Sequence, residues 1–209
     1  KGNAVMKLES LARMNGIESG GAHNALFDAN LTKLVLEKIY KEQNITWRSA
    51  MMTGSREEVE NFSKNELMFS LNEYFYGKSK LYLVAPLYHE HMLHPIYKWV
   101  QAFDLKFDPK IYFELPFDEL KTEIQKTPKF IRTIRSNKAP VLLHSDYASK
   151  AEPYSVMTKE QLSERAKLIK GNKDFCARVS LALAEIAQEK RDTGDQSDIT
   201  PEESIYFKF

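Results

Sequence analysis

Cysteine is nearly absent from this sequence, and long apolar runs are missing. The single cysteine, Cys176, cannot form an internal disulfide. No apolar stretch approaches the roughly 20 residues that a helix needs to cross a bilayer. Residues 1–7 contain neither an initiator methionine nor the apolar core of a signal peptide, so we expect the chain to begin inside a longer protein. These absences predict a soluble protein of a reducing compartment, the cytoplasm, without a membrane partner.

Net charge is also small. Thirty basic side chains stand against 29 acidic ones, which leaves a net charge of +1. Attraction to nucleic acid must therefore come from local patches, because the whole chain creates no strong field. A content of 43% hydrophobic and 28% charged residues is typical of globular proteins and allows one large domain or two small ones.

Helices are predicted near both ends of the chain. Apolar residues recur every three or four positions over residues 22–40, and a shorter helix is expected over residues 6–14. Thr158 to Gln161 matches a capping box, and residues 175–190 show core spacing of a further helix. A helix over residues 117–125 has acidic residues in its first turn, which suits the helix dipole.

The middle of the chain has the texture of short strands. Aromatic and β-branched runs alternate with prolines, a pattern that favours a small barrel or sandwich. The runs cover residues 81–84, 96–103, 111–115, 130–135 and 141–143. Before them, residues 47–73 are mixed in character, and we expect this stretch to include a linker.

A histidine and a carboxylate stand five residues apart at the entrance to the second helix. Five residues advance a helix by about 140° beyond a full turn, so His23 and Asp28 share a site only if His23 lies on the loop that Gly20 and Gly21 begin. Asp28 is of the type that binds hard divalent ions, and His23 of the type that takes a proton from metal-bound water. The spacing alone equally fits a capping loop before a surface helix.

Several segments together resemble one nuclease family. Lys7 to Glu18, followed by Ala22 to Ala29, looks like the third exonuclease motif of bacterial exonuclease I, a DEDDh-type 3′→5′ exonuclease of single-stranded DNA. Val84 to Leu87 and Asn137 to Leu142 are similar to segments of that family's second domain, in the same order and at similar spacing. The resemblance covers most of the chain.

The resemblance implies roles for the two residues of the motif. His23 matches the general base and Asp28 the last metal-binding carboxylate of a site with two Mg²⁺ or Mn²⁺ ions, which hydrolyses DNA to mononucleotides in DNA repair. It also implies two partners, single-stranded DNA and the acidic tail of single-stranded-DNA-binding protein. The family's first motif is Asp-x-Glu, and this chain contains no such triplet. We therefore expect an internal fragment of the exodeoxyribonuclease that is inactive alone.

The expected fold class is α+β, in three pieces. Residues 1–45 would end a ribonuclease-H-like exonuclease domain, and residues 46–150 would form a Src-homology-type β-barrel with an inserted helix. Residues 151–209 would begin a helical C-terminal domain.

Basic residues on the barrel are candidates for contact with DNA. Arg132, Arg135 and Lys138 follow one another closely near aromatic runs, and cations beside aromatic rings commonly bind single strands. An alternative reading is a non-catalytic module that kept the barrel to bind single-stranded DNA or protein and lost the nuclease site.

Three histidines between His89 and His94 suggest a zinc site. They fail as His-Glu-x-x-His because Leu93 occupies the second ligand position and Pro95 would interrupt the helix. We therefore expect an ordinary loop between two strands here, and an unrelated zinc protein is the third hypothesis.

Overall fold

The computed structural model describes residues 7–19, 24–44, 47–48, 53–75 and 78–192. The α-helices of this part of the chain include α1 (Leu8–Met14), α2 (Ala25–Glu42), α4 (Arg56–Asn65), α5 (Lys110–Phe113), α6 (Phe117–Gln125), α7 (Asp146–Ser149), α8 (Lys159–Gly171) and α9 (Lys173–Asp192). The strands are β1 (Phe69–Phe75), β2 (Lys78–Pro86), β3 (Val100–Asp104), β4 (Ile131–Ile134) and β5 (Val141–Leu143). Three short 3₁₀ turns are η1 (His89–His91), η2 (Ser136–Lys138) and η3 (Tyr154–Val156).

The strands form one antiparallel sheet in the order β4-β3-β2-β1-β5. β1 and β2 make a hairpin in which Phe69 lies opposite Val84, and Val84 in turn lies opposite Asp104 of β3. β4 extends the sheet beyond β3, and β5 returns to pair with β1. The mixture of helices with an antiparallel sheet agrees with the predicted α+β class.

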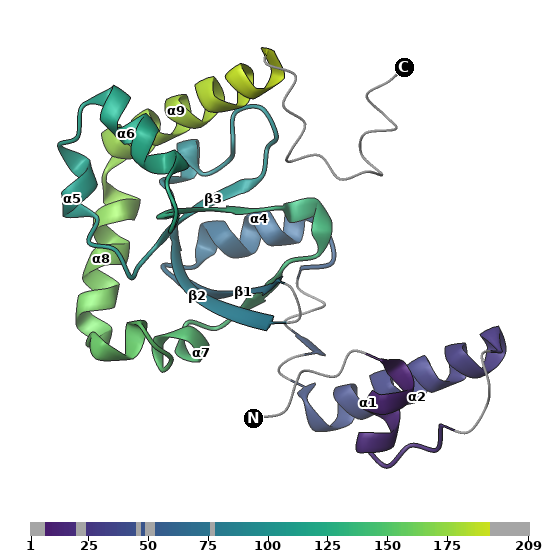
Figure 1. Cartoon of the computed structure of the whole chain (residues 1–209). Coiled ribbons are helices and arrows are strands. Elements are labelled where there is room, and N and C mark those ends of the chain that lie inside the picture. The colour runs from purple at the N-terminus through teal and green to yellow at the C-terminus, as the bar shows by residue number, and fades with distance from the viewer. Residues whose placement is uncertain (1–6, 20–23, 45–46, 49–52, 76–77, 193–209) are drawn as a thin grey trace.

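Helices cover both faces of the sheet (Figure 1). Val59 of α4 packs with Val84 and Ala102 on one face. Leu83 and Phe103, their neighbours in sequence, point to the opposite face and pack against α6, α8 and α9. Because successive side chains of a strand alternate between faces, β3 needs apolar residues on both, and all five of its residues are buried.

The C-terminal helices share the core of the sheet. The predicted capping box begins α8: the Thr158 side chain accepts from the Gln161 N–H, and the Gln161 side chain accepts from the Thr158 N–H. Phe175 and Cys176 of α9 are fully buried in the cluster that contains Phe103. Burial raises the pKa of the Cys176 thiol to about 11, so it stays protonated at neutral pH. The described residues of the third predicted segment therefore pack directly on the sheet.

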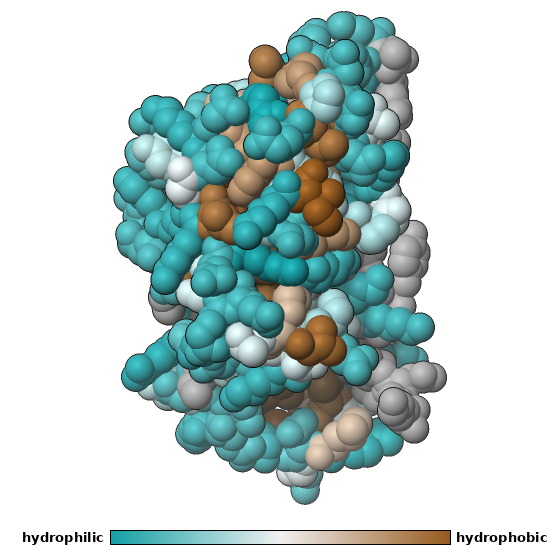
Figure 2. All heavy atoms as spheres, turned by 90° about the vertical axis from the view of Figure 1, so that its left-hand side faces the viewer, coloured by the Kyte–Doolittle hydropathy of each residue, from teal (hydrophilic) through white to brown (hydrophobic). Residues whose placement is uncertain are grey.

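The outer surface over α5 and α8 is largely hydrophilic, with apolar groups in small patches (Figure 2). In the described part of the chain no helix has both the length and the apolar character needed to span a membrane.

Three local expectations differ from the structure. Residues 111–115 do not form a strand: Pro109 is the N-cap of the short helix α5, and the Asp108 carboxylate accepts from the Lys110 N–H at its start. The strand expected from residue 96 begins only at Val100, because the preceding residues form a turn held by backbone hydrogen bonds. β1 lies partly in the stretch predicted to contain a linker.

Candidate nuclease motif and nucleic-acid interface

Asp28 lies in the first turn of α2. Asn24 caps this helix: its side-chain oxygen accepts from the Leu26 N–H at 2.9 Å. Asp28 is half-buried, and its carboxylate benefits from the positive end of the helix dipole. His23 directly precedes the cap and lies outside the described residues. The structure therefore bears out a helix that begins just after His23, and the chemical roles of both residues stay predictions.

Among the residues that the structure describes, Asp28 is not part of a complete set of metal ligands. Within the described residues, no group of three or more histidine, cysteine or carboxylate side chains converges as a metal site. Glu18 is exposed, and Glu37 pairs with Lys33 at 3.8 Å on the same helix. Two adjacent divalent ions repel each other and need several converging carboxylates, so the described residues alone do not fit a two-metal centre.

Arg132 on β4 takes part in a buried polar cluster. Its guanidinium carbon lies 3.6 Å from the centroid of the Tyr82 ring, and its Nη2 lies 3.4 Å from Oδ2 of the fully buried Asp104. Nη1 lies 3.6 Å from Oε2 of Glu73, whose pKa is raised because burial outweighs the neighbouring positive charge. Tyr154 completes the cluster by donating its hydroxyl to Asp104 at 2.6 Å. The Arg132 side chain is only 14% exposed, and its guanidinium charge lies mainly against the carboxylates of Asp104 and Glu73.

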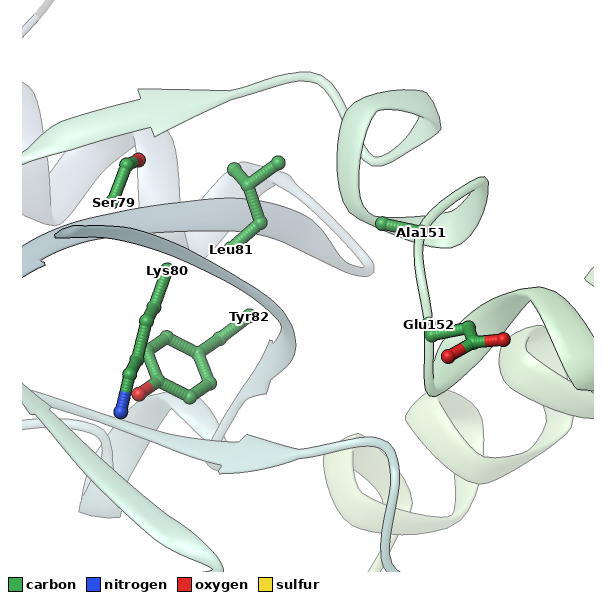
Figure 3. A pocket seen from close by; sticks show the side chains of 6 residues that line it. All are labelled: Ser79, Lys80, Leu81, Tyr82, Ala151 and Glu152. Atoms are coloured by element: carbon green, nitrogen blue, oxygen red, sulfur yellow. The ribbon is translucent and has the colours of Figure 1, made fainter. Parts of the chain in front are cut away.

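A cavity of about 440 Å³ lies beside this cluster, between β2 and the segment after α7. Figure 3 shows Lys80 and Tyr82 on one face of β2, with Leu81 turned to the other face and Glu152 across the opening. Lys80 and Glu152 are a cation and a carboxylate on opposite walls, which gives the cavity a mixed charge.

Arg135 and Lys138 lie beyond the end of β4. Arg135 places its guanidinium over the Trp99 ring, 5.0 Å from the centroid, and Lys138 is exposed on η2. Arg132 is thus set apart from the other two predicted cations by its internal contacts. Contact of all three with DNA stays a prediction. The aromatic partners Tyr97 and Trp99 were not singled out from the sequence, because their spacing of two residues is also ordinary strand alternation.

The histidines do not gather around a common ion among the described residues. His94 is buried, and its Nδ1 accepts from the N–H groups of Ile96 and Tyr97 at 3.1 and 3.3 Å. Burial, together with nearby positive charges, lowers the pKa of His94 to about 4. His89 lies 3.8 Å from the Glu90 carboxylate on the η1 turn. The His94 ring therefore organises a turn, as the loop interpretation expects.

Solved structures with the same fold include E. coli exonuclease I in complex with a dA16 oligonucleotide, at 19% identity and a TM-score of 0.61. The alignment covers 88% of this chain and 41% of that one. This chain has the fold of part of exonuclease I. The ExoI/SSB-Ct complex gives a TM-score of 0.62 at 19% identity with the same coverage of 88% and 41%. Exonuclease I from Methylocaldum szegediense gives 0.61 at 20% identity, covering 86% of this chain and 40% of its own.

The likeness is thus one of three-dimensional structure. No family model and no curated protein matches the sequence. The chain spans about two fifths of the length of the exonuclease I structures, and identities near 20% show the fold alone. The activity, substrates and partners of a whole enzyme follow from this likeness only as proposals.

Proposed function

We propose that this chain is part of a 3′→5′ exodeoxyribonuclease that degrades single-stranded DNA to mononucleotides by two-metal hydrolysis. The observation that carries this proposal is the exonuclease I fold over 88% of the chain, including a structure solved with a single-stranded oligonucleotide. The sequence of the His23 and Asp28 motif also supports it, because the motif spans the start of a helix whose cap the structure describes.

The proposed arrangement has the end of a ribonuclease-H-like domain, a Src-homology-type barrel and the beginning of a helical domain, with the boundaries expected from the sequence. Support comes from α2, which leaves Leu26 71% exposed and Leu34 46% exposed. Leu31 is the only buried residue of this 18-residue helix. Apolar side chains left open on one helix indicate a surface that packs against further protein. The remainder of a nuclease domain is a suitable partner for that surface.

In this proposal His23 acts as general base and Asp28 as one metal ligand of the complete site. The single carboxylate of Asp28 has to be joined by others from outside the chain, since the chain has no Asp-x-Glu triplet. Mg²⁺ or Mn²⁺ is the expected ion, because carboxylate oxygens favour hard cations.

Two partners belong to the proposal. Single-stranded DNA is expected along the basic and aromatic surface of the sheet domain. The acidic tail of single-stranded-DNA-binding protein is the expected protein partner, supported by the fold shared with the ExoI/SSB-Ct complex. A cytoplasmic role in DNA repair would follow from these partners.

A non-catalytic binding module is the second candidate, and the isolated position of Asp28 favours it. One experiment separates the two. The complete protein that contains this chain is incubated with 3′-labelled single-stranded DNA and Mg²⁺ or Mn²⁺, beside an Asp28→Asn variant and the 209-residue chain alone. We expect mononucleotide release by the complete protein only. Binding without release would support the module, and Asp28-dependent release by the 209-residue chain would refute the predicted incompleteness of its site.

A further inference from the structure

Two aromatic rings and two arginines form a cluster at the end of the sheet. The rings of Tyr97 and Trp99 stack with their centroids 4.7 Å apart and their planes at 19°. The Arg135 guanidinium carbon lies 5.0 Å from the Trp99 centroid, and that of Arg191 lies 5.5 Å from the Tyr97 centroid. We call these four residues the arginine–aromatic cluster. Its members come from the loop before β3, the end of β4 and the last turn of α9, so the fold alone brings them together.

The loop that carries the rings is held firmly. Lys98, between the two aromatic residues, has a left-handed backbone with φ of 58°, a conformation that a non-glycine residue adopts only where the surrounding structure enforces it. Bonds around the turn fix it: the His94 N–H donates to the Trp99 carbonyl at 2.8 Å, and the Lys98 N–H donates to the His94 carbonyl at 2.9 Å. The Arg56 guanidinium donates to the Lys98 carbonyl at 2.8 Å. The rings are therefore positioned before any ligand arrives.

The cluster also has a positive electrostatic environment. Lys98 is exposed beside the rings, and Arg191 is exposed at the end of α9. Burial lowers the pKa of His94 most, and the charges of Arg191 and Lys98 lower it further, so both cations lie near this ring. A region of this kind attracts an anion.

We propose that the arginine–aromatic cluster binds the sugar–phosphate backbone of single-stranded DNA, with Arg135 and Arg191 as phosphate ligands. A guanidinium stacked on a ring still presents the N–H groups at its edge to phosphate oxygens. Because stacking already restricts the side chain, less conformational entropy is lost when the phosphate binds. Tyr97 and Trp99 position these cations and contact an unstacked base. This inference rests on the proposed function and specifies which surface holds the strand.

The test measures binding of a dye-labelled oligo-dT to the 209-residue chain over a series of salt concentrations. Each phosphate contact to a single strand contributes about 0.7 to the slope of log affinity against log salt. We expect Arg135→Gln and Arg191→Gln each to make the slope less steep by about that amount and to weaken binding about tenfold. Lys167→Gln, which removes a charge from the exposed face of α8, is the matched control and should leave the slope unchanged.

A second measurement reports direct contact in a chain with both arginines intact. The chain has two tryptophans, so Trp47→Phe leaves Trp99 as the sole tryptophan, which is excited at a wavelength where the ten tyrosines do not absorb. Oligo-dT should quench this fluorescence in proportion to binding. Trp99→Leu should weaken binding about threefold to tenfold with the salt slope retained, because the ring supports the cations without carrying charge.

The outcomes separate this inference from the proposed function. If the chain binds oligo-dT but the arginine variants match Lys167→Gln, or Trp99 fluorescence does not respond, the arginine–aromatic cluster is not the binding surface and the proposed role in DNA binding survives. If the unmodified chain binds no oligo-dT at low salt, both the inference and that role are refuted. Circular dichroism melts establish that each variant is folded.

Discussion

Replacing Arg132 with methionine should destabilise the protein through Asp104. Methionine keeps a chain of similar length over the Tyr82 ring but removes the positive charge beside a fully buried carboxylate. Loss of one partner from a buried ion pair typically costs about 3–5 kcal/mol. Lys106 lies 3.6 Å from the same carboxylate and offsets part of the loss, so we expect a decrease of about 2–4 kcal/mol in the free energy of unfolding. For a chain of this size that is roughly 4–16 °C in Tm.

Urea unfolding and thermal melts measure this effect, with exposed Lys167→Met as the control that should change stability by less than about 0.5 kcal/mol. Adding Asp104→Asn to Arg132→Met removes the uncompensated charge while keeping an acceptor for the Tyr154 hydroxyl. The double variant should therefore be more stable than Arg132→Met alone. An Arg132→Met protein as stable as the parent, or an absence of rescue, would show that the charge of Arg132 is not used inside the fold.

Three further outcomes are expected. The pKa of His94 is lowered from 6.5 to about 4, so on acidification the unfolded chain takes up a proton before the folded chain does, and stability should fall as pH drops from about 6.5 to 4. In pH-dependent melts the His94→Asn variant should lose less stability than the parent over that window. Equal losses would contradict the assignment of this pH dependence to His94. In the complete enzyme, His23→Ala should lower kcat roughly 10²-fold or more with little change in DNA affinity, measured by single-turnover digestion; parental turnover would leave His23 a loop residue. Thr158→Ala should cost about 1 kcal/mol in urea unfolding because it removes the cap of α8, and a neutral result would show that the capping box contributes nothing.

Local rules predicted the elements whose signals lie within a few residues of each other. The capping box at Thr158 and the acidic first turn of α6 are complete within one helical turn, and both helices are present. The run at residues 111–115 has strand composition, but Tyr112 and Phe113 pack on the core from a short helix, and Leu115 does so just after it, whereas Ile111 is exposed. Such a run carries no information on whether a helix or a strand buries it.

The candidate site was predictable only in part for a similar reason. The motif around Asp28 is contiguous, so the sequence reveals it. The grouping of Arg135 with Trp99 and Arg191 depends on three distant segments meeting, which no local spacing expresses. Likewise, the residues next to Arg132 in sequence do not predict its ion pair with the buried Asp104, which lies on the neighbouring strand.

The two-sided burial of the sheet has an evolutionary consequence. A sheet whose strand β3 is packed above and below leaves no open face there to remodel, and changes in β3 would disturb two cores at once. New recognition arises more readily at the rim, where loops such as the one that carries Tyr97 and Trp99 border solvent. Homologous chains should therefore conserve the sheet and diverge in these loops, so that they bind different ligands at the same rim.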